Sequence, residues 1–360
     1  MKITLTGELK TIMSNRGSLH NYFGWPTAVR LRNGKIAVAA SGFRLYHVCP
    51  FGKTVIAYSE DDGESFTAPA AVLDTALDDR DGGLCTFGKS GLIVTSFNNT
   101  VKFQRDSNAL RAESPTKSYI EAYLDTVPKD AEDRDLGLTY RVSCDNGVTF
   151  GRVMKSPITS PHGPIELKDG TILYVGTSHN NGFSIHAYKM NLSDGSFEHL
   201  SEINTDAIKD RSLTPCEPYA IELDDGRILC HIRVQRYGTD PILTIYQCES
   251  ADGGKSWSIP VQIIGDKEGA PPHILKHSSG ALISTYGRRE MTFGIKAMIS
   301  TDGGRNWSES EYLYKNETSA DLGYPSTVEL SDGSLFTVFY AYPDGGRSAE
   351  ILGQKWTFSD

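Results

Sequence analysis

The stretch Ser300–Trp307, with the sequence STDGGRNW, decides the fold because the chain repeats it. Three segments share its pattern of Ser, Asp two residues later, Gly two further on and then an aromatic ring: SEDDGESF from Ser59, SCDNGVTF from Ser143 and SADGGKSW from Ser250. A degenerate copy, NLSDGSF, surrounds Asp194. In such a turn the Asp accepts hydrogen bonds from backbone amides, Gly supplies a positive φ and the ring packs into the neighbouring layer. We call this turn an Asp box and expect it to be structural.

A second repeat consists of hairpins. Six segments place a glycine-containing turn between runs rich in β-branched and aromatic residues, which is typical of β-hairpins: LRNGKIAV, FGKSGLIV, LKDGTILY, LDDGRILC, HSSGALIS and LSDGSLFT. The residues before the turn glycines are Asn33, Ser90, Asp169, Asp225, Ser279 and Asp332. Their spacings are 57, 79, 56, 54 and 53 residues, and periods of this size indicate a propeller or a repeat array.

Each period contains a hairpin, a connecting strand and a further strand next to the Asp box, so six periods predict an all-β protein, a six-bladed β-propeller with Asp-box repeats. We expect one domain over residues 1–360. The long spacing contains polar, partly helix-compatible sequence, which predicts an insertion at about residues 101–135 within the second blade. MKITLTGEL is expected to close the ring beside AEILGQKWTF. Two stacked β-sandwiches would explain the strands but not the sixfold period.

Composition excludes several classes of function. The chain has 36 Lys and Arg against 45 Asp and Glu, a net charge of −9 that opposes binding to nucleic acid or to an anionic membrane. It has no apolar run of the length that spans a bilayer. The start, MKITLTGELK, lacks the apolar stretch of a secretory signal, which favours the cytoplasm. The six cysteines form no CxxC pair, so we expect reduced thiols, no metal and no cofactor. The sequence makes no prediction about oligomeric state.

The repeats also predict which residues meet at the axis. In each blade the first strand begins, and the second strand ends, at the same face of the propeller. The residues just before the first strands are Trp25, Asp81, His162, Glu217, His273 and Tyr324. The residues just after the second strands are Arg44, Asn98, His179, Arg233, Arg288 with Arg289, and Tyr340. Both sets should line one funnel, with the Asp boxes at the opposite face.

This set of residue types suits chemistry on an acidic sugar. A carboxylic acid can protonate a leaving oxygen, a second carboxylate can assist the nucleophile, and arginines pair with a substrate carboxylate. Tyr324 is the specific element, because tyrosine is a known nucleophile in some glycoside hydrolases. A carboxylate nucleophile would be repelled by a carboxylate at the anomeric carbon, whereas a phenol that gives its proton to Glu217 would not. An ordinary strand-edge tyrosine and a structural Glu217–Arg233 ion pair are the competing interpretations.

The same residues resemble the sialidase (neuraminidase) superfamily, whose retaining members carry Asp boxes on a six-bladed propeller. The segment DDRDGGL places Asp81 like that family's acid/base aspartate, with Asp79 as the alternative. In CEPYAIELDDGRILCHIR, Glu217 and Arg233 resemble the activating glutamate and a carboxylate-binding arginine. In LGYPSTVEL, Tyr324 resembles the nucleophile.

The remaining arginines match the resemblance less completely. Arg288 or Arg289 stands near the family's last carboxylate-binding arginine, and Arg44 resembles the arginine after the first hairpin. The family's opening Arg-Ile-Pro reads Gly24-Trp25-Pro26 here, so the first arginine of the triad is missing from its place. Either Arg44, Lys53 or another cation substitutes for it, or the ligand is not an ordinary sialic acid.

Histidines complete the expected pocket. His20, His47, His162 and His273 suggest a histidine-rich site with Trp25, although the last two also fit strand-start packing positions. The first hypothesis is an exo-acting, sialidase-like glycoside hydrolase that removes a terminal acidic sugar with retention. The alternatives are a lyase or hydrolase that acts on another acidic saccharide with a histidine base, and a non-catalytic carbohydrate-binding propeller.

Overall fold

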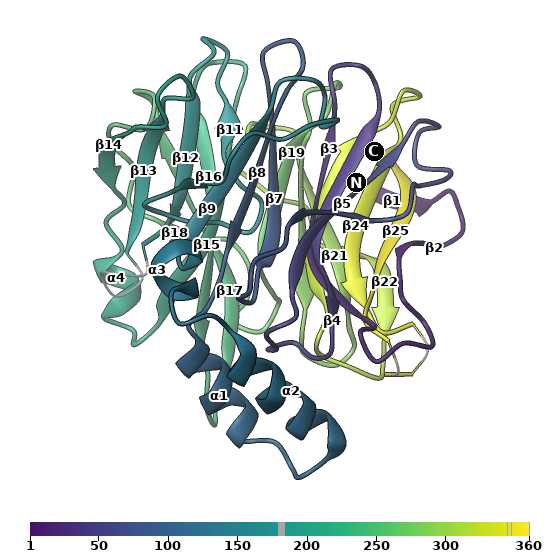
Figure 1. Ribbon diagram of the computed structural model, residues 1–360. Helices are drawn as coiled ribbons and strands as arrows, with labels where there is room; N and C mark the ends of the chain where they lie inside the picture. Colours follow the sequence, from purple (N-terminus) through teal and green to yellow (C-terminus); the bar gives the residue numbers. More distant parts are fainter. Residues whose placement is uncertain (179–183, 344, 347, 360) are drawn as a thin grey trace.

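The computed structural model describes residues 1–178, 184–343, 345–346 and 348–359. In it, six antiparallel sheets stand around a common axis, as Figure 1 shows from the side. In blades 1 to 5 each sheet is formed by strands that follow one another in sequence, and the sheet of blade 6 combines the last three strands with the first two, so the chain passes from blade to blade in order. This arrangement confirms the predicted six-bladed β-propeller and excludes the pair of sandwiches.

The blades have the following strands. Blade 1 contains β3 (Tyr22–Arg30), β4 (Ile36–Arg44), β5 (Lys53–Ser59) and β6 (Ala70–Leu73). Blade 2 contains β7 (Arg80–Phe87), β8 (Gly91–Phe97), β9 (Leu138–Ser143) and β10 (Met154–Lys155). Blade 3 contains β11 (Ile165–Glu166), β12 (Ile172–Thr177), β13 (Ile185–Met190) and β14 (Phe197–Glu202). Blade 4 contains β15 (Thr214–Glu222), β16 (Ile228–Arg236), β17 (Ile242–Ser250) and β18 (Val261–Gln262). Blade 5 contains β19 (Pro272–Lys276), β20 (Leu282–Arg288), β21 (Phe293–Ser300) and β22 (Glu311–Asn316). Blade 6 contains β23 (Gly323–Glu329), β24 (Leu335–Ala341), β25 (Glu350–Ser359), β1 (Lys2–Leu5) and β2 (Lys10–Met13).

Both ends of the described chain lie in blade 6. β1 pairs antiparallel with β25, with Lys2 opposite Ser359, and β2 pairs with the other half of β25. Figure 1 shows the two termini side by side. The ring is therefore closed by hydrogen bonds between the first and last strands, as the sequence predicts.

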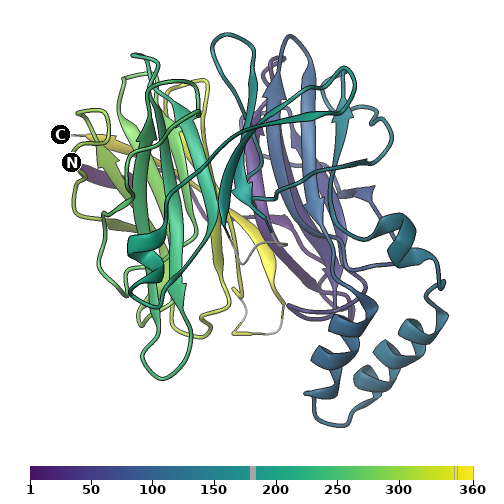
Figure 2. The ribbon, with the colours of Figure 1, turned by 90° about the vertical axis from the view of Figure 1, so that its left-hand side faces the viewer.

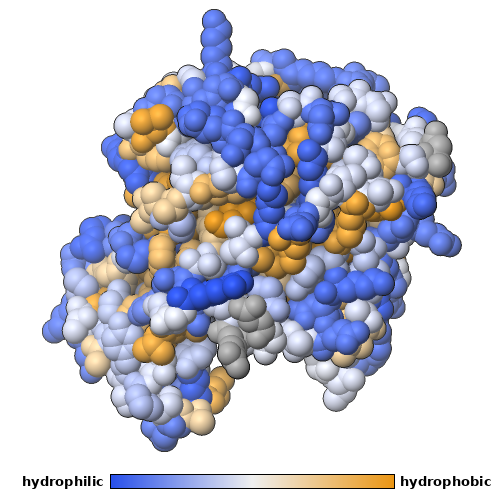
Figure 3. Space-filling model, turned by 90° about the vertical axis from the view of Figure 1, so that its right-hand side faces the viewer, coloured by the Kyte–Doolittle hydropathy of each residue, from blue (hydrophilic) through white to orange (hydrophobic). Residues whose placement is uncertain are grey.

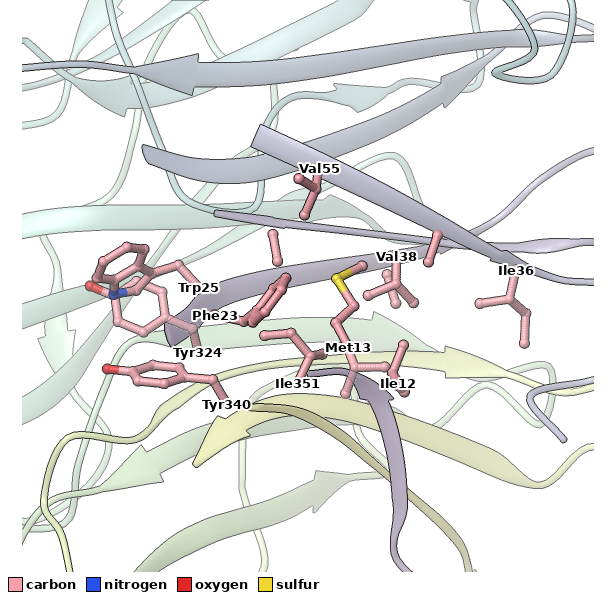
Figure 4. Packing of buried hydrophobic residues seen from close by; sticks show 14 of the residues in the cluster. Ile12, Met13, Phe23, Trp25, Ile36, Val38, Val55, Tyr324, Tyr340 and Ile351 are labelled. Atoms are coloured by element: carbon pink, nitrogen blue, oxygen red, sulfur yellow. The ribbon is translucent and has the colours of Figure 1, made fainter. Parts of the chain in front are cut away.

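The hydrophobic core lies between neighbouring blades. One cluster joins blade 6 to blade 1 and includes Phe23, Val38 and Ile351, all 0% exposed. Figure 4 shows that Trp25, Tyr324 and Tyr340 lie together at one end of this cluster. Strand residues alternate between the two faces of a sheet, so each blade packs apolar side chains against both of its neighbours. The same packing fixes the three aromatic side chains.

The Asp boxes lie at the hairpin end of the blades. The backbone nitrogen of Asn146, inside one box, donates a hydrogen bond to the carbonyl oxygen of Ser90 in the β7–β8 turn at 2.8 Å. In the last box, Asp302 accepts hydrogen bonds from the backbone nitrogen of Asn306 at 2.9 Å and from the Ser300 hydroxyl at 2.9 Å. The box therefore ties its own turn together, far from the opposite face where the second strands end.

Asp302→Ala is expected to lower the free energy of unfolding by about 1–2 kcal/mol, because it removes a carboxylate that accepts several hydrogen bonds. The turnover number of the folded protein should not change. Urea unfolding measures the first quantity. Asp194→Ala is the matched control. The Asp194 carboxylate accepts hydrogen bonds from the backbone nitrogen of Ser196 at 2.8 Å and from the Ser196 side chain, but Leu192 replaces the serine that bonds to the aspartate in the other boxes, so this change should cost less. Equal losses in both variants would contradict the structural role of the box.

A helical insertion interrupts blade 2 between β8 and β9. It consists of α1 (Val101–Ala109), α2 (Pro115–Thr126) and α3 (Ala131–Asp135), while a short α4 (Asp206–Lys209) lies between blades 3 and 4. Figures 1 and 2 both show α1 and α2 projecting beyond the end of the sheets at which β8 ends. That end is the face predicted to carry the funnel.

The insertion packs firmly on the propeller. Ile120 and Leu124 of α2 join a buried cluster with Leu45 and Cys49, which follow β4. Gln104 of α1 is 3% exposed and donates a hydrogen bond to a buried carboxylate, that of Asp78, at 2.8 Å. Figure 3 shows a mostly hydrophilic surface with small, separate hydrophobic areas. Among the described residues, no helix combines the length and the apolar character that crossing a membrane requires.

Candidate active site

Four blades begin with the same backbone irregularity. In β3, β7, β15 and β23 the pairing with the next strand shifts register near the first residues, which marks a β-bulge. The φ angle is positive at each bulge, 57° at Trp25, 60° at Asp81, 47° at Glu217 and 50° at Tyr324. Such strain is uncommon outside glycine, and it clusters at functional sites.

The phenol of Tyr324 lies between a carboxylate and a guanidinium. Its hydroxyl donates a hydrogen bond to Oε1 of Glu217 at 2.7 Å. Nη1 of Arg233 donates to the Tyr324 oxygen at 3.0 Å and to Oε2 of Glu217 at 2.5 Å. Burial raises the pKa of the Tyr324 phenol well above its usual value; Glu217 raises it further and Arg233 opposes the rise. The phenol is therefore protonated at neutral pH, and its proton points at a carboxylate.

Asp81 faces the same group of residues from blade 2. It is 7% exposed, and burial raises the pKa of its carboxyl to about 7; the charge of Arg80 lowers this pKa and that of Glu217 raises it. The charge of Asp81 also raises the pKa of Tyr324, which places carboxyl and phenol in one electrostatic neighbourhood. A carboxyl group that stays protonated near neutral pH can donate a proton.

The glycines after Asp81 allow the blades to approach each other at this bulge. A Cβ at Gly82 would lie 2.7 Å from the backbone nitrogen of Ala40 in blade 1. A Cβ at Gly83 would lie 2.6 Å from the backbone nitrogen of Gly163, just before the first strand of blade 3. The sequence DDRDGGL is therefore built to carry Asp81 into a crowded position.

The two acids before Asp81 are engaged elsewhere. Asp79, the alternative acid, is 1% exposed and accepts hydrogen bonds from the backbone nitrogen of Thr75 at 2.7 Å and from the amide of Asn98 at 3.3 Å. Asp78 pairs with Arg44 at 2.6 Å, and both side chains are 0% exposed. Asp81 is thus the acid that the structure brings towards Tyr324.

Adjacent arginines at the end of β20 point in different directions. The guanidinium carbon of Arg289 lies 5.7 Å from the centre of the Tyr324 ring. Arg288 instead pairs with Glu268 at 3.0 Å. Neighbouring residues of an extended strand point to opposite faces, so only Arg289 joins Arg233 beside the phenol.

Trp25 occupies the place of the missing arginine. Its ring is 2% exposed and its centre lies 6.5 Å from that of Tyr324. The guanidinium carbons of Arg80 and Arg44 lie 4.2 and 4.9 Å from the centre of the Trp25 ring. The Arg44 guanidinium is neutralised by its buried acid, and Lys53 pairs with an aspartate, Asp74, at 2.6 Å. Neither of the two cations suggested as substitutes thus presents an unpaired charge to Tyr324.

His162 and His273 fill the axis below these residues. They are 1% and 4% exposed, and their ring centres are 5.0 Å apart although they come from blades 3 and 5. Tyr219 of blade 4 stacks on His273 at 4.7 Å. Burial lowers the pKa of His162 to about 3 and that of His273 well below its usual value. The structure places both rings in packing positions, one of the two interpretations left open by the sequence.

A carboxylate that the sequence did not single out organises the neighbouring side of the funnel. Asp321 accepts hydrogen bonds from the hydroxyls of Tyr340 at 2.7 Å, Tyr22 at 3.0 Å and Tyr342 at 3.2 Å. It also lies 3.0 Å from Nδ1 of His47. Asp321 stands three residues before Tyr324, as Asp78 stands three residues before Asp81, but the other four blades have no acid at this offset, and only the spatial arrangement reveals the partners of Asp321.

The other predicted histidines lie elsewhere. His20 contacts the carbonyl oxygen of Phe43 at 2.9 Å and the hydroxyl of Tyr119 at 3.3 Å, which links blade 1 to α2. His179 lies outside the described residues. In the described part of the chain, no group of three or more His, Cys, Asp or Glu side chains could hold a metal ion.

Two cavities of different character lie near these residues. A cavity of about 160 Å³ is lined by four cationic side chains, those of Arg233, Arg236, Lys267 and Arg289, together with Glu290, Tyr237 and the apolar residues Pro241, Ile242 and Leu243. A cavity of about 760 Å³ is lined by Tyr22, His47, Asp321 and Tyr342 from the propeller and by residues of the insertion. The site therefore combines the phenol of Tyr324, its proton acceptor Glu217, the protonated carboxyl of Asp81 and the cavity lined by arginines.

Comparisons with known proteins agree with the fold. A family model described as the BNR repeat-like domain matches residues 128–337. A search of curated proteins finds no match. A protein of unknown function from Dyadobacter fermentans is similar in structure, with a TM-score of 0.76 and 19% identity over 99% of both chains.

Two sialidase structures are also similar. The intramolecular trans-sialidase from Ruminococcus gnavus, in complex with oseltamivir carboxylate, has a TM-score of 0.64 and 14% identity over 97% of both chains. The Trypanosoma rangeli sialidase, in complex with 2,3-difluorosialic acid, has a TM-score of 0.63 and 13% identity; the match covers 98% of this chain and 59% of that one. At these identities the similarity concerns the fold. The match to the family model covers more than half of the sequence, and the chain therefore belongs to the BNR repeat-like family.

Proposed function

We propose that the protein is an exo-acting glycoside hydrolase that removes a terminal acidic sugar with retention of anomeric configuration. The observation that carries the proposal is the hydrogen bond of 2.7 Å from the Tyr324 hydroxyl to Glu217, with Arg233 bonded to both groups. Membership of the BNR repeat-like family and the similarity of the fold to two sialidases support it.

In the first step, the Tyr324 oxygen attacks the anomeric carbon while its proton passes to Glu217. The bond from the anomeric carbon to the leaving oxygen breaks, and Asp81 gives its proton to that oxygen. Arg233 lies 3.0 Å from the phenol oxygen, where a cation stabilises the phenolate character that develops. The product of this step is a sugar bound covalently to Tyr324.

In the second step, water attacks the anomeric carbon from the side that the leaving group vacated. Asp81, now a carboxylate, takes the proton of that water, and the Tyr324 oxygen leaves and recovers its proton from Glu217. Two inversions give net retention. Atoms and protons balance over the two steps, and both carboxyl groups return to their starting states.

The arginines beside Tyr324 favour an acidic sugar. Arg233 lies 3.0 Å from the phenol oxygen and the guanidinium carbon of Arg289 lies 5.7 Å from the ring centre, and guanidinium groups bind carboxylates through paired hydrogen bonds. Trp25 replaces a third cation, so the carboxylate is held by two arginines. A volume of about 160 Å³ suits a carboxylate and its neighbouring substituent rather than a whole saccharide.

The test is a screen of aryl glycosides of sialic, other ulosonic and uronic acids, with the first-formed anomer identified by proton NMR. We expect release of the aryl alcohol and a sugar of the starting anomeric configuration. The inverted anomer would contradict the tyrosine nucleophile. An unsaturated product that absorbs in the ultraviolet would instead indicate a lyase, and binding without product would indicate a carbohydrate-binding propeller.

The pH dependence of kcat/KM should reflect the pKa of the proposed acid, Asp81. Asp81 must be protonated to act as the acid, and its pKa is about 7. Below pH 7 the protonation of Asp81 should therefore not limit kcat/KM, and above pH 7 the value of kcat/KM should fall about tenfold per pH unit. Asp81→Asn should abolish this alkaline limb and lower the rate. Asp79→Asn is the matched control and should keep the limb. The measurement is kcat/KM from pH 5 to pH 9. If the decrease above pH 7 persisted in Asp81→Asn, another group would be the acid.

A further inference from the structure

The guanidinium of Arg233 has two edges that could hold a carboxylate, and one of them is occupied by residues of the proposed mechanism. Nη1 donates hydrogen bonds to Oε2 of Glu217 and, at 3.0 Å, to the Tyr324 oxygen. Because a terminal guanidinium nitrogen carries two protons, these bonds use both protons of Nη1. A ligand carboxylate must therefore approach Arg233 from the other edge, which consists of Nε and Nη2.

This second edge is incompletely satisfied by the protein. Nε of Arg233 is buried and has no hydrogen-bond partner among the described residues. Nη2 donates a hydrogen bond to the hydroxyl oxygen of Tyr237 at 3.0 Å. A buried donor without a partner is costly and rare in proteins. The edge is thus suited to an acceptor that comes from outside the chain.

Another arginine of this protein shows what fits such an edge. Nε and Nη2 of Arg134 donate hydrogen bonds to the carboxylate of Asp135 at 3.1 and 2.8 Å. The two nitrogens project in parallel, so that one carboxylate can accept from both, and such a paired bond between charged groups is stronger than a single bond to a neutral oxygen. A ligand carboxylate on this edge of Arg233 would satisfy Nε and replace the phenol oxygen at Nη2.

The side chain of Tyr237 can leave this position at little cost. Tyr237 follows β16, in the turn that leads to β17, and is 73% exposed. Among the described residues its hydroxyl has one hydrogen-bond partner, which is Arg233. The turn itself is held by other residues, because Asp240 pairs with Arg236 at 3.2 Å and with Lys267 at 3.3 Å. A rotation of the Tyr237 side chain therefore breaks one hydrogen bond and leaves the turn intact.

The cavity of about 160 Å³ lies beside the same edge. Arg233, Tyr237 and Arg289 all line it. Arg289 donates from Nε to the carbonyl oxygen of Leu322 at 3.1 Å, and no ion pair of Arg289 occurs among the described residues. An anion that moved Tyr237 aside would thus meet the guanidinium groups of Arg233 and Arg289 together.

We propose that Tyr237 controls the access of the substrate carboxylate to Arg233: its phenol occupies Nη2 until the carboxylate displaces it and binds Nε and Nη2 together. The inference rests on the proposed function, in which Arg233 binds an acidic sugar, and adds a residue that competes with the substrate. Because the substrate has to break the hydrogen bond between Tyr237 and Arg233, loss of the Tyr237 hydroxyl should strengthen binding. Loss of a residue that held the substrate would weaken it.

Tyr237→Phe tests the proposal by removing the hydroxyl and keeping the ring. This variant should lower KM for the best aryl glycoside of the screen by about threefold to tenfold, with kcat changed by less than about twofold. Tyr237→Ala, which also removes the ring, should lower KM in the same way. A KM that stays the same or rises in both variants would overturn the proposal.

Tyr119→Phe is the matched control for the loss of an exposed phenol. Tyr119 is 43% exposed, and its hydroxyl also contacts a basic side chain, that of His20, at 3.3 Å. It lies on α2 and does not line the cavity beside Arg233. Tyr119→Phe should therefore change neither KM nor kcat, and an equal decrease of KM in Tyr119→Phe and Tyr237→Phe would contradict a specific role of Tyr237.

Calorimetric titration separates this inference from the proposed hydrolysis. The ligands are sialic acid and glucuronic acid, and the methyl ester of each acid is the control without a carboxylate. At least one acid should bind Tyr237→Phe about threefold or more tightly than it binds the unmodified protein, and the esters should bind both proteins equally. This pattern in a protein that hydrolyses no glycoside would support the role of Tyr237 and refute the hydrolase. Hydrolysis combined with equal affinities of both proteins for the acids, or failure of both acids to bind Tyr237→Phe, would overturn the role of Tyr237.

Discussion

Tyr324→Phe is expected to lower kcat for the best aryl glycoside by about 10³-fold or more, because it removes the oxygen that bonds to the anomeric carbon. The fold should tolerate the change, since Arg233 and Glu217 still pair at 2.5 Å and the ring still packs against Trp25. A fluorinated analogue of the substrate should add its sugar mass to Tyr324 in the unmodified protein and not in the variant.

Tyr58→Phe is the control for the loss of a phenol. The Tyr58 hydroxyl donates to the carbonyl oxygen of Gly147, next to an Asp box at the opposite face, so its loss should leave kcat unchanged. Retained turnover in Tyr324→Phe, or sugar mass on another residue, would remove Tyr324 from the mechanism.

Glu217→Gln is expected to have two effects. The loss of the proton acceptor should lower kcat by about 10²–10⁴-fold. The buried guanidinium of Arg233 would also lose the carboxylate it pairs with, which should lower the free energy of unfolding by about 3 kcal/mol. Initial rates and thermal unfolding measure the two quantities, and the loss of stability separates this variant from Tyr324→Phe.

Glu249→Gln is the matched control for Glu217→Gln. Glu249 pairs with Arg227 at 2.6 Å, but its side chain is 45% exposed. An exposed ion pair contributes about 0–1 kcal/mol, so this variant should keep both its stability and its turnover. If Glu217→Gln behaved like Glu249→Gln, the Glu217–Arg233 pair would be a structural pair without a part in proton transfer.

The fold could be predicted from the sequence because the same short turn sequences recur from blade to blade of the propeller. Each turn glycine and each Asp box encodes the same turn, and equal spacing fixes the number of blades. The repeat also placed Trp25, Asp81, Glu217 and Tyr324 at equivalent positions, which the structure shows to be four strained bulges at one end of the blades. The sequence pattern identified these positions without revealing the bulges that turn the side chains inwards.

The side-chain contacts between blades could not be predicted from the repeat pattern. Whether Arg288 or Arg289 reaches Tyr324 depends on where β20 ends, to within one residue. The pairing of Arg44 with Asp78 depends on a loop after blade 1 and on Gln104 of the insertion, which lies outside the period. Asp321 shares its place, three residues before the bulge, with Asp78 alone, and the two acids have different partners. Sequence reasoning recovers what the repeats share and misses what single loops add.

The pairing of β1 and β2 with β25 sets the order in which blade 6 can assemble during translation. β1 is synthesised before β25, yet the two strands are partners, with Lys2 opposite Ser359. Blade 6 carries Tyr324, so a nascent chain stalled before β25 contains Asp81 of blade 2 and Glu217 of blade 4 but cannot complete the sheet that bears Tyr324. A truncation before β25 would thus leave that sheet open although the other five blades are complete.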